Sequence, residues 1–179
     1  LKMEGRAAIV LPDGFLFGEG MKTRLKEKLL MDCNLHTIVR LPNGVFNPYT
    51  GIKTNLLFFT KGQRTETIWY YEHPYPEGVK SYNKTKPMRF EEFQSEIAWW
   101  GEENDGFASR TETEQAWKVS IDDIKARNYN LDIKNPHIGE QISLDPNELM
   151  RHYIEQQQGI SELHNKLKAV LSEALNGKG

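Results

Sequence analysis

Residues 43–53 combine the side chains that a site for a planar ligand needs. They supply two aromatic rings, two amides, a hydroxyl and a cation, in Phe46, Tyr49, Asn43, Asn47, Thr50 and Lys53. An aromatic face beside hydrogen-bonding groups suits a nucleic-acid base extruded from its stack, which is held by stacking and by polar contacts to its edge. The alternative is that the rings tuck under the edge of a sheet and bind nothing.

The turn that opens this segment has a counterpart earlier in the chain. Ile9–Phe15 and Ile38–Phe46 both run from an apolar strand through Leu-Pro, Asp or Asn, and Gly to an aromatic residue. If the two strands are parallel, both turns lie at the carboxyl edge of the sheet, where open α/β sheets bind ligands. The plainer interpretation is that Pro-Asx-Gly is good turn chemistry and nothing more.

Other chemistry is poorly represented. The five histidines at 36, 73, 137, 152 and 164 lack metal-ligand spacing, so we expect no metal site. The sequence contains no G-x-S-x-G elbow, Walker loop or G-x-G-x-x-G turn. A modest phosphate-contacting surface could be formed by Lys22, Arg24, Lys26, Lys28, Lys53, Lys61 and Arg64. Charge on an exposed helix face is also common without any ligand.

The elements that must position these residues follow from local patterns. Residues 7–11 resemble a buried parallel strand at the very start, so the chain is expected to begin inside a fold. A helix over 21–32, with Met21, Leu25 and Leu29 on its apolar face, and a strand over 36–41 follow. Strands over 54–60 and 67–71 would form a pair at one edge. This succession predicts the tail of a doubly wound α/β sheet.

The remainder is less regular. Residues 72–116 form an aromatic-rich connector with a short helix over 90–100, and Ser120 opens another short helix through a capping box. A long helix is expected from about Pro146 to Asn176, because Asp145-Pro146-Asn147-Glu148 is a strong helix start. Its apolar seam predicts packing along another helix. The seam includes Tyr153, Ile160, Leu163, Leu167 and Val170.

Composition sets wider limits. The 179 residues carry a net charge of −2 and one cysteine, and they contain no apolar run of 18 residues. The length suits one domain with a real core, and a transmembrane helix is not expected. The single cysteine favours a reducing, cytoplasmic location.

Taken in order, several segments resemble the modification subunits of type I restriction–modification systems, which are N6-adenine DNA methyltransferases. The resemblance is carried by Gly5–Phe17, Leu41–Phe46, Tyr49–Phe59, Trp117–Ile124 and Tyr129–Leu131. It covers most of residues 5–64 and 117–133 and is loose between them.

The resemblance implies direct methyl transfer from S-adenosylmethionine to the adenine amino nitrogen. The family's glycine-rich motif and its Asn-Pro-Pro-Phe/Tyr motif lie upstream of these segments, and neither occurs here. We therefore expect no catalytic residue in this sequence and no activity from it alone. Phe46 matches the family aromatic that stacks on the flipped adenine, and Tyr49 is the second choice. Asn47, Thr50 and Lys53 are the accompanying target-base contacts.

The resemblance also implies partners, namely DNA, the specificity subunit that docks on the C-terminal helical region, and the restriction subunit. The expected fold is α/β, the C-terminal part of a Rossmann-like methyltransferase sheet, mixed, with an antiparallel edge hairpin. The expected divisions are a catalytic-domain tail (1–71), an irregular connector (72–144) and a coiled-coil-like partner helix (145–179). The alternative function is a non-catalytic adaptor that pairs through its C-terminal helix while the sheet serves as scaffold.

Overall fold

The computed structural model describes residues 1–137 together with 150, 153–154, 157, 160–161, 163–164 and 166–168. The chain divides into two compact units, Leu1–Ile138 and Gly139–Gly179. No helix among the described residues is both long enough and apolar enough to cross a membrane.

The first unit is built on a five-stranded mixed sheet of order β1-β3-β2-β4-β5. The strands are β1 (Arg6–Pro12), β2 (Cys33–Arg40), β3 (Thr54–Lys61), β4 (Thr67–Glu72) and β5 (Ala116–Ser120). β3 is antiparallel to both β1 and β2, so those two strands run in the same direction. β4 is parallel to β2, and β5 is antiparallel to β4. The predicted mixed α/β sheet is confirmed.

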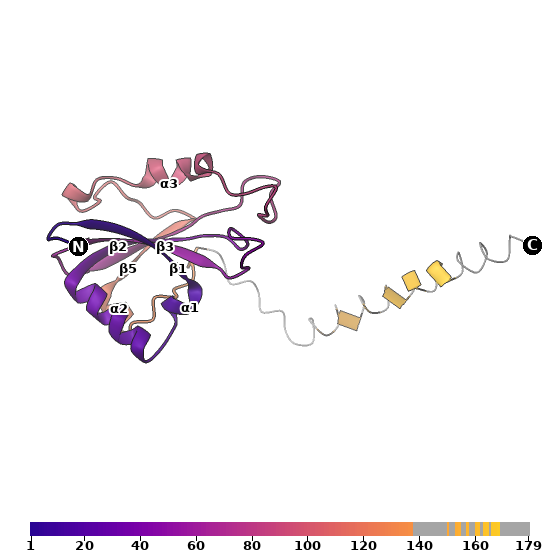
Figure 1. Ribbon diagram of the computed structural model, residues 1–179, viewed down its shortest axis with the longest axis horizontal. Helices are drawn as coiled ribbons and strands as arrows, with labels where there is room; N and C mark the ends of the chain where they lie inside the picture. The colour runs from indigo at the N-terminus through magenta and orange to yellow at the C-terminus, as the bar shows by residue number, and fades with distance from the viewer. Residues whose placement is uncertain are drawn as a thin grey trace, which may run out of the picture. The chain divides into compact units, whose positions relative to one another are not determined.

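Two layers cover the sheet (Figure 1). One contains α1 (Asp13–Leu16), α2 (Met21–Asp32) and α4 (Ile121–Ala126). The other is the connector between β4 and β5, with the 3-10 turns η1 (Phe90–Phe93) and η2 (Glu103–Asp105) and the helix α3 (Gln94–Trp99). The main core lies under α1, α2 and α4, where Tyr70 stacks on Trp117 with ring centroids 5.3 Å apart. A smaller core under the connector includes Val39 and Tyr71, with Trp99 and Trp100 packed against it.

The first strand differs from the prediction. β1 lies at an edge of the sheet and pairs antiparallel with β3, and Ile9 and Val10 are exposed. A short apolar run does not encode its partner, and here β3 inserts between the two strands that share a direction. The expected pairing of 54–60 with 67–71 is also wrong, because β2 lies between β3 and β4. Antiparallel pairs lie at both edges of the sheet, β1 with β3 and β4 with β5.

The helix α2 has the predicted bounds but a different buried face. Met21 and Leu25 are 71% and 52% exposed, whereas Lys26 and Leu30 are buried. Lys26 Nζ donates to the carbonyl oxygens of Leu16 (2.7 Å) and Gly18 (2.9 Å), and these bonds satisfy its buried ammonium group. Burial lowers the pKa of Lys26. This lysine is therefore not available to the predicted phosphate-contacting surface.

The short helices are positioned by local polar contacts. Ser120 caps α4 as predicted, because its side-chain oxygen accepts a hydrogen bond from the Asp123 backbone N–H at 3.1 Å. The helix expected over 90–100 is split into η1 and α3, and Phe90 and Ile97 on its expected apolar face are exposed. The side chain that α3 buries is Glu96, which bonds to the His73 ring.

The described positions of the second unit are helical. Tyr153, Ile160, Leu163 and Leu167 are all exposed. Val170, which completes the predicted seam, lies outside the described residues.

Candidate functional site

The loop 41–53 joins β2 to β3 at the end of the sheet where the carboxyl ends of β1 and β2 both lie. The turn after β1 therefore lies at the same end of the sheet as the turn after β2, as the two Leu-Pro-Asx-Gly sequences predicted. Within the loop, Asn47 N–H donates to the Gly44 carbonyl oxygen, and Tyr49 and Thr50 N–H donate to that of Phe46. Gly44 has φ +78°, a conformation that favours glycine.

The two aromatic rings of the loop reach solvent. Phe46 is 39% exposed and Tyr49 is 89% exposed, so neither ring is sequestered under the edge of the sheet. Phe46 is the better held of the two, because its carbonyl oxygen accepts two backbone hydrogen bonds and its side chain is partly covered. A partly covered ring on a hydrogen-bonded turn offers a planar ligand an ordered apolar face.

The three polar side chains of the predicted site hold the loop in place. Asn47 Nδ2 donates to the Tyr82 carbonyl oxygen in the connector at 3.1 Å. Thr50 Oγ1 accepts from the Ile52 N–H at 3.1 Å. Lys53 Nζ lies 4.0 Å from a Glu72 carboxylate oxygen at the end of β4. The structure therefore brings the five predicted residues into one loop, with Asn47 and Lys53 also tied to neighbouring segments.

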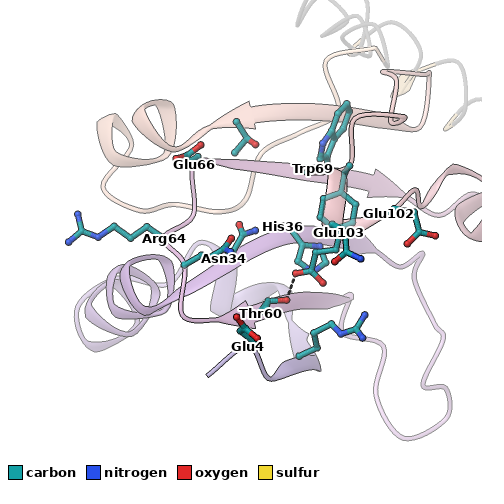
Figure 2. A pocket seen from close by; sticks show the side chains of 15 residues that line it. Glu4, Asn34, His36, Thr60, Arg64, Glu66, Trp69, Glu102 and Glu103 are labelled. Carbon is teal, nitrogen blue, oxygen red and sulfur yellow. Dashed lines mark hydrogen bonds between the residues drawn. The ribbon is translucent and has the colours of Figure 1, made fainter. Parts of the chain in front are cut away.

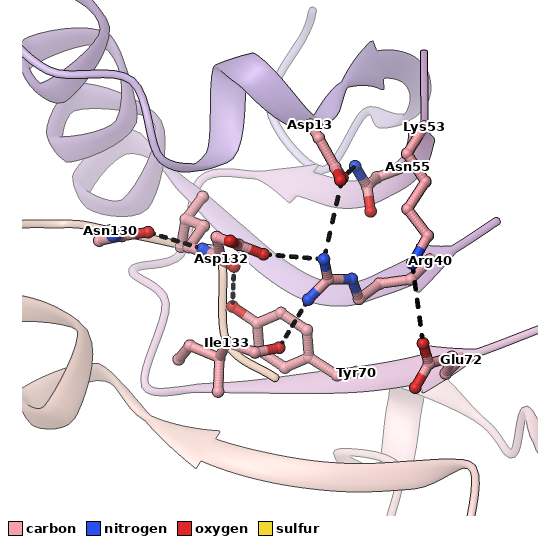
Figure 3. A network of polar contacts seen from close by, with 10 residues as sticks. Asp13, Arg40, Lys53, Asn55, Tyr70, Glu72, Asn130, Asp132 and Ile133 are labelled. Atoms are coloured by element: carbon pink, nitrogen blue, oxygen red, sulfur yellow. Dashed lines mark hydrogen bonds and ion pairs between the residues drawn. The ribbon is translucent and has the colours of Figure 1, made fainter. Parts of the chain in front are cut away.

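Beneath the loop lies a polar network that the sequence analysis did not find (Figure 3). Arg40, at the end of β2, donates to an Asp132 carboxylate oxygen at 2.7 Å and to the Ile133 carbonyl oxygen at 2.8 Å. Its guanidinium also lies 3.9 Å from Asp13, which accepts a 2.6 Å hydrogen bond from Asn55 Nδ2. In the sequence, the one feature that could have indicated this network is the charged Arg40 at the end of the apolar run that forms β2.

The network also reaches the main core. Tyr70 OH donates to the Leu131 carbonyl oxygen at 3.0 Å, and burial raises the pKa of this phenol, which keeps it a hydrogen-bond donor. Leu131 N–H in turn donates to the Leu16 carbonyl oxygen at 3.0 Å. Segment 130–133 therefore bonds both to Arg40, next to the second turn, and to Leu16, just after the first.

A cavity of about 380 Å³ opens beside the loop, at the ends of β2 and β4. Asn43, Lys53, Tyr75 and His73 are among the residues that line it. His73 is buried, its Nδ1 bonds to the Glu96 carboxylate, and its Nε2 has no partner among the residues that the structure describes. The cavity is of a size that holds a small organic group.

A larger hollow of about 1070 Å³ lies at the opposite end of the strands, under η2 (Figure 2). Its lining mixes Arg6 and Arg64 with several glutamates, and Thr60 bonds there to Glu103. Burial lowers the pKa of His36 in its wall to about 4, so this ring is neutral at pH 7. None of the predicted base-contacting residues lies here. Across the described residues no group of three or more metal-ligating side chains gathers.

Comparisons with known proteins agree on one family. The N-6 DNA methylase family model matches residues 1–145. The chain is 70% identical over 174 residues to the type I restriction enzyme EcoEI methylase subunit of Escherichia coli. This match covers 97% of this chain and 36% of that protein. This chain therefore spans about a third of the length of that curated relative.

Two solved structures share the fold. The modification subunit of a putative type I restriction enzyme from Vibrio vulnificus YJ016 is 48% identical with a TM-score of 0.66, over 74% of this chain and 28% of that one. A chain from a type I restriction–modification system, solved to explain complex assembly and conformational transition, is 34% identical with a TM-score of 0.71. That match covers 99% of this chain and 37% of the other.

Proposed function

Because the chain belongs to the N-6 DNA methylase family, we propose that it is the C-terminal part of a type I modification subunit that methylates N6 of adenine in DNA. The observation that carries the proposal is the loop 41–53, which presents the exposed ring of Phe46 at the edge where β1 and β2 end. The intact subunit, not these residues alone, is the enzyme. The proposal places it in the cytoplasm with its DNA substrate.

Phe46 is the stacking wall for the flipped adenine in this proposal. Stacking of a base on an aromatic side chain contributes about 1–3 kcal/mol. The contribution requires a ring that is both accessible and held, and the turn around Phe46 meets both conditions. Tyr49 is the second, more exposed ring. Asn47, Thr50 and Lys53 shape the loop around the target nucleotide.

The methyl donor in this family is S-adenosylmethionine, and the turns at the ends of β1 and β2 do not fit a site for it. The turns after β1 and β2 are Pro-Asp-Gly and Pro-Asn-Gly, each with one glycine, and neither forms a glycine-rich cradle. The proposal assigns the donor and the hydrogen bonds to the adenine amino group to parts of the subunit outside this sequence. The chain supplies the stacking wall and the end of the sheet.

The C-terminal helix is the partner-binding element of the proposal. Tyr153, Ile160 and Leu167 are exposed and seven residues apart, with exposed Leu163 between the last two, which is the spacing of a coiled-coil seam. We assign this seam, with Val170, to the DNA-specificity subunit, and the restriction subunit joins the resulting complex. The divisions 1–71, 72–144 and 145–179 then correspond to catalytic tail, connector and partner helix.

The stacking role is tested in the intact methyltransferase. Phe46→Ala should lower kcat/KM for DNA methylation by about 10- to 100-fold, the loss of one stacking interaction. Phe46→Trp should retain most of the activity. 2-Aminopurine at the target position should report weaker base extrusion in the alanine variant. The matched control is Phe90→Ala, because Phe90 is another exposed ring, on η1. Unchanged methylation by Phe46→Ala would remove the stacking role.

The partner helix has a separate test. Leu163→Asp with Leu167→Asp should abolish co-purification with the specificity subunit, because both charges would enter the seam. Ser161→Asp with Lys168→Asp adds two carboxylates outside the seam and should leave co-purification intact. If the leucine variant still binds the specificity subunit, the seam serves something else. Loss of co-purification together with unchanged methylation by Phe46→Ala would favour the adaptor function.

A further inference from the structure

The connector carries a concentrated positive charge next to the loop 41–53. Residues 80–89, which we name the cationic arm, contain Lys80, Lys84, Lys86 and Arg89 and no acidic residue. All four cations are exposed, and none forms an ion pair within the described part of the chain. The whole chain has a net charge of −2, so the arm departs locally from its average.

The tip of the arm is a tight, internally bonded hairpin. Asn83 and Lys86 exchange backbone hydrogen bonds of 3.1 Å in both directions. Asn83 Oδ1 also accepts hydrogen bonds from the N–H groups of Thr85 (3.0 Å) and Lys86 (2.9 Å). These bonds hold Lys84 and Lys86 two residues apart on a defined backbone. A fixed pair of cations loses less conformational entropy on binding an anion than two cations on an unstructured segment.

The arm is fastened to the candidate site. Tyr82 is buried, its hydroxyl donates to Glu92, and its carbonyl oxygen accepts the hydrogen bond from Asn47 Nδ2. Tyr75, just before the arm, donates through its hydroxyl to the Asn43 carbonyl oxygen at 2.8 Å. In Figure 1 the connector bends back at the end of the sheet where the loop 41–53 lies. The cations are therefore carried on a segment bonded directly to the loop that presents Phe46.

We propose that the cationic arm binds the backbone phosphates of the DNA strand that flanks the target adenine. This inference rests on the proposed function and deepens it. Phosphate contacts fix the register and orientation of a protein on the duplex without reading sequence, and lysine and arginine supply most of them. An arm bonded to the stacking loop holds the backbone beside the nucleotide that must rotate out. Exposed, unpaired cations are what such contacts require, because each one releases condensed counterions from the DNA.

The test uses the intact methyltransferase assembled with its specificity subunit. DNA affinity is measured against KCl concentration for the wild type and for Lys84→Gln with Lys86→Gln. Each lost phosphate contact should make the negative slope of log K against log salt about 0.9 less steep, which near 0.1 M salt is roughly an 8-fold loss of affinity per contact. The difference should shrink toward 1 M salt. Lys84→Arg with Lys86→Arg should restore the wild-type slope.

The matched control removes the same charge elsewhere. Lys125→Gln with Arg127→Gln changes two exposed cations at the C-terminal end of α4, in the layer on the other face of the sheet. It should leave the slope unchanged. An unaltered slope in the arm variant, or an equal loss in the control, would overturn the proposal.

Two further outcomes separate this inference from others. If the arm variant keeps its DNA slope but loses the specificity subunit on purification, the arm contacts an acidic protein surface and the phosphate assignment is wrong. If the arm variant shows the expected change in slope but the wild-type complex does not methylate adenine, the phosphate contact of the arm stands and the proposed function fails. If the wild-type complex methylates adenine and the arm variant keeps the wild-type slope, the proposed function stands and the phosphate contact of the arm fails.

Discussion

Replacing Arg40 by methionine should destabilise the first unit more than any single surface change. The side chain of Arg40 is 8% exposed, and its guanidinium donates to the Asp132 carboxylate and to the Ile133 carbonyl oxygen. Methionine preserves much of the buried stem and removes the charge and both hydrogen bonds. The Asp132 carboxylate and the Ile133 carbonyl then lose their partner, and Asp13 loses a cation 3.9 Å away.

The magnitude follows from how buried the partners are. Removing one member of a fully buried pair costs about 3–5 kcal/mol, because an uncompensated charge remains. The side chain of Asp132 is 31% exposed and can be partly rehydrated. We therefore expect the free energy of unfolding to fall by about 2–4 kcal/mol. With a urea m-value of about 2 kcal/mol/M, the unfolding midpoint moves down by about 1–2 M.

Urea unfolding followed by far-UV circular dichroism measures this shift, with an unchanged m-value as evidence that the folded state is retained. Lys28→Met is the control, since it removes the cation of the exposed pair Lys28–Asp32 and should cost less than about 0.5 kcal/mol. A double-mutant cycle with Asp132→Asn should show a coupling of about 1–3 kcal/mol. Equal urea midpoints for Arg40→Met and Lys28→Met would show that the contacts of Arg40 do not stabilise the first unit as argued.

Three further predictions concern other sites. Because the pKa of His36 is about 4 in the folded chain and 6.5 when unfolded, the unfolded state binds more protons between these values, and stability should rise by up to about 3 kcal/mol from pH 4 to pH 6.5. His36→Gln should remove this rise in a urea series across pH, and an identical pH profile in the variant would contradict the assignment. Gly44→Ala should cost about 1–2 kcal/mol, because φ is +78° and a Cβ would lie 2.6 Å from Asn47 Nδ2, whereas Gly51→Ala meets no atom within 4 Å and should be nearly neutral. Ser120→Ala should lower Tm by about 2–4 °C through the loss of the α4 cap, and no change in Tm would mean that the cap contributes little.

Much of the local structure follows from the sequence, because its signals are local. The bounds of α2 and the cap at Ser120 are set by residues within a few positions of each other. The common edge of the two Leu-Pro-Asx-Gly turns could also be anticipated, because both follow strands that run in one direction. The loop with Phe46 could be located for the same reason.

The rest depends on contacts between distant segments. The order of the strands, with β3 inserted between β1 and β2, leaves no local trace in an apolar run. Lys26 reads as a surface cation until the carbonyl oxygens of Leu16 and Gly18 are placed beside it. Arg40 and Asp132 are 92 residues apart, so their pairing could not be read from either neighbourhood. The cations of the arm were visible in the sequence, but their attachment to the loop was not.

The hydrogen bonds of segment 130–133 also constrain when the unit can fold. Leu131 closes contacts with Leu16 and Tyr70, and Asp132 closes the contact with Arg40, at sequence separations of 61 or more. Contacts of such separation form slowly, since a long stretch of chain must be ordered before they are made. During synthesis these contacts cannot form until residue 133 has left the ribosome. A chain that stopped before Leu131 would leave the Arg40 guanidinium and the Tyr70 phenol without these partners. Segment 130–133 is therefore the last part of the first unit that must be made before both groups are satisfied.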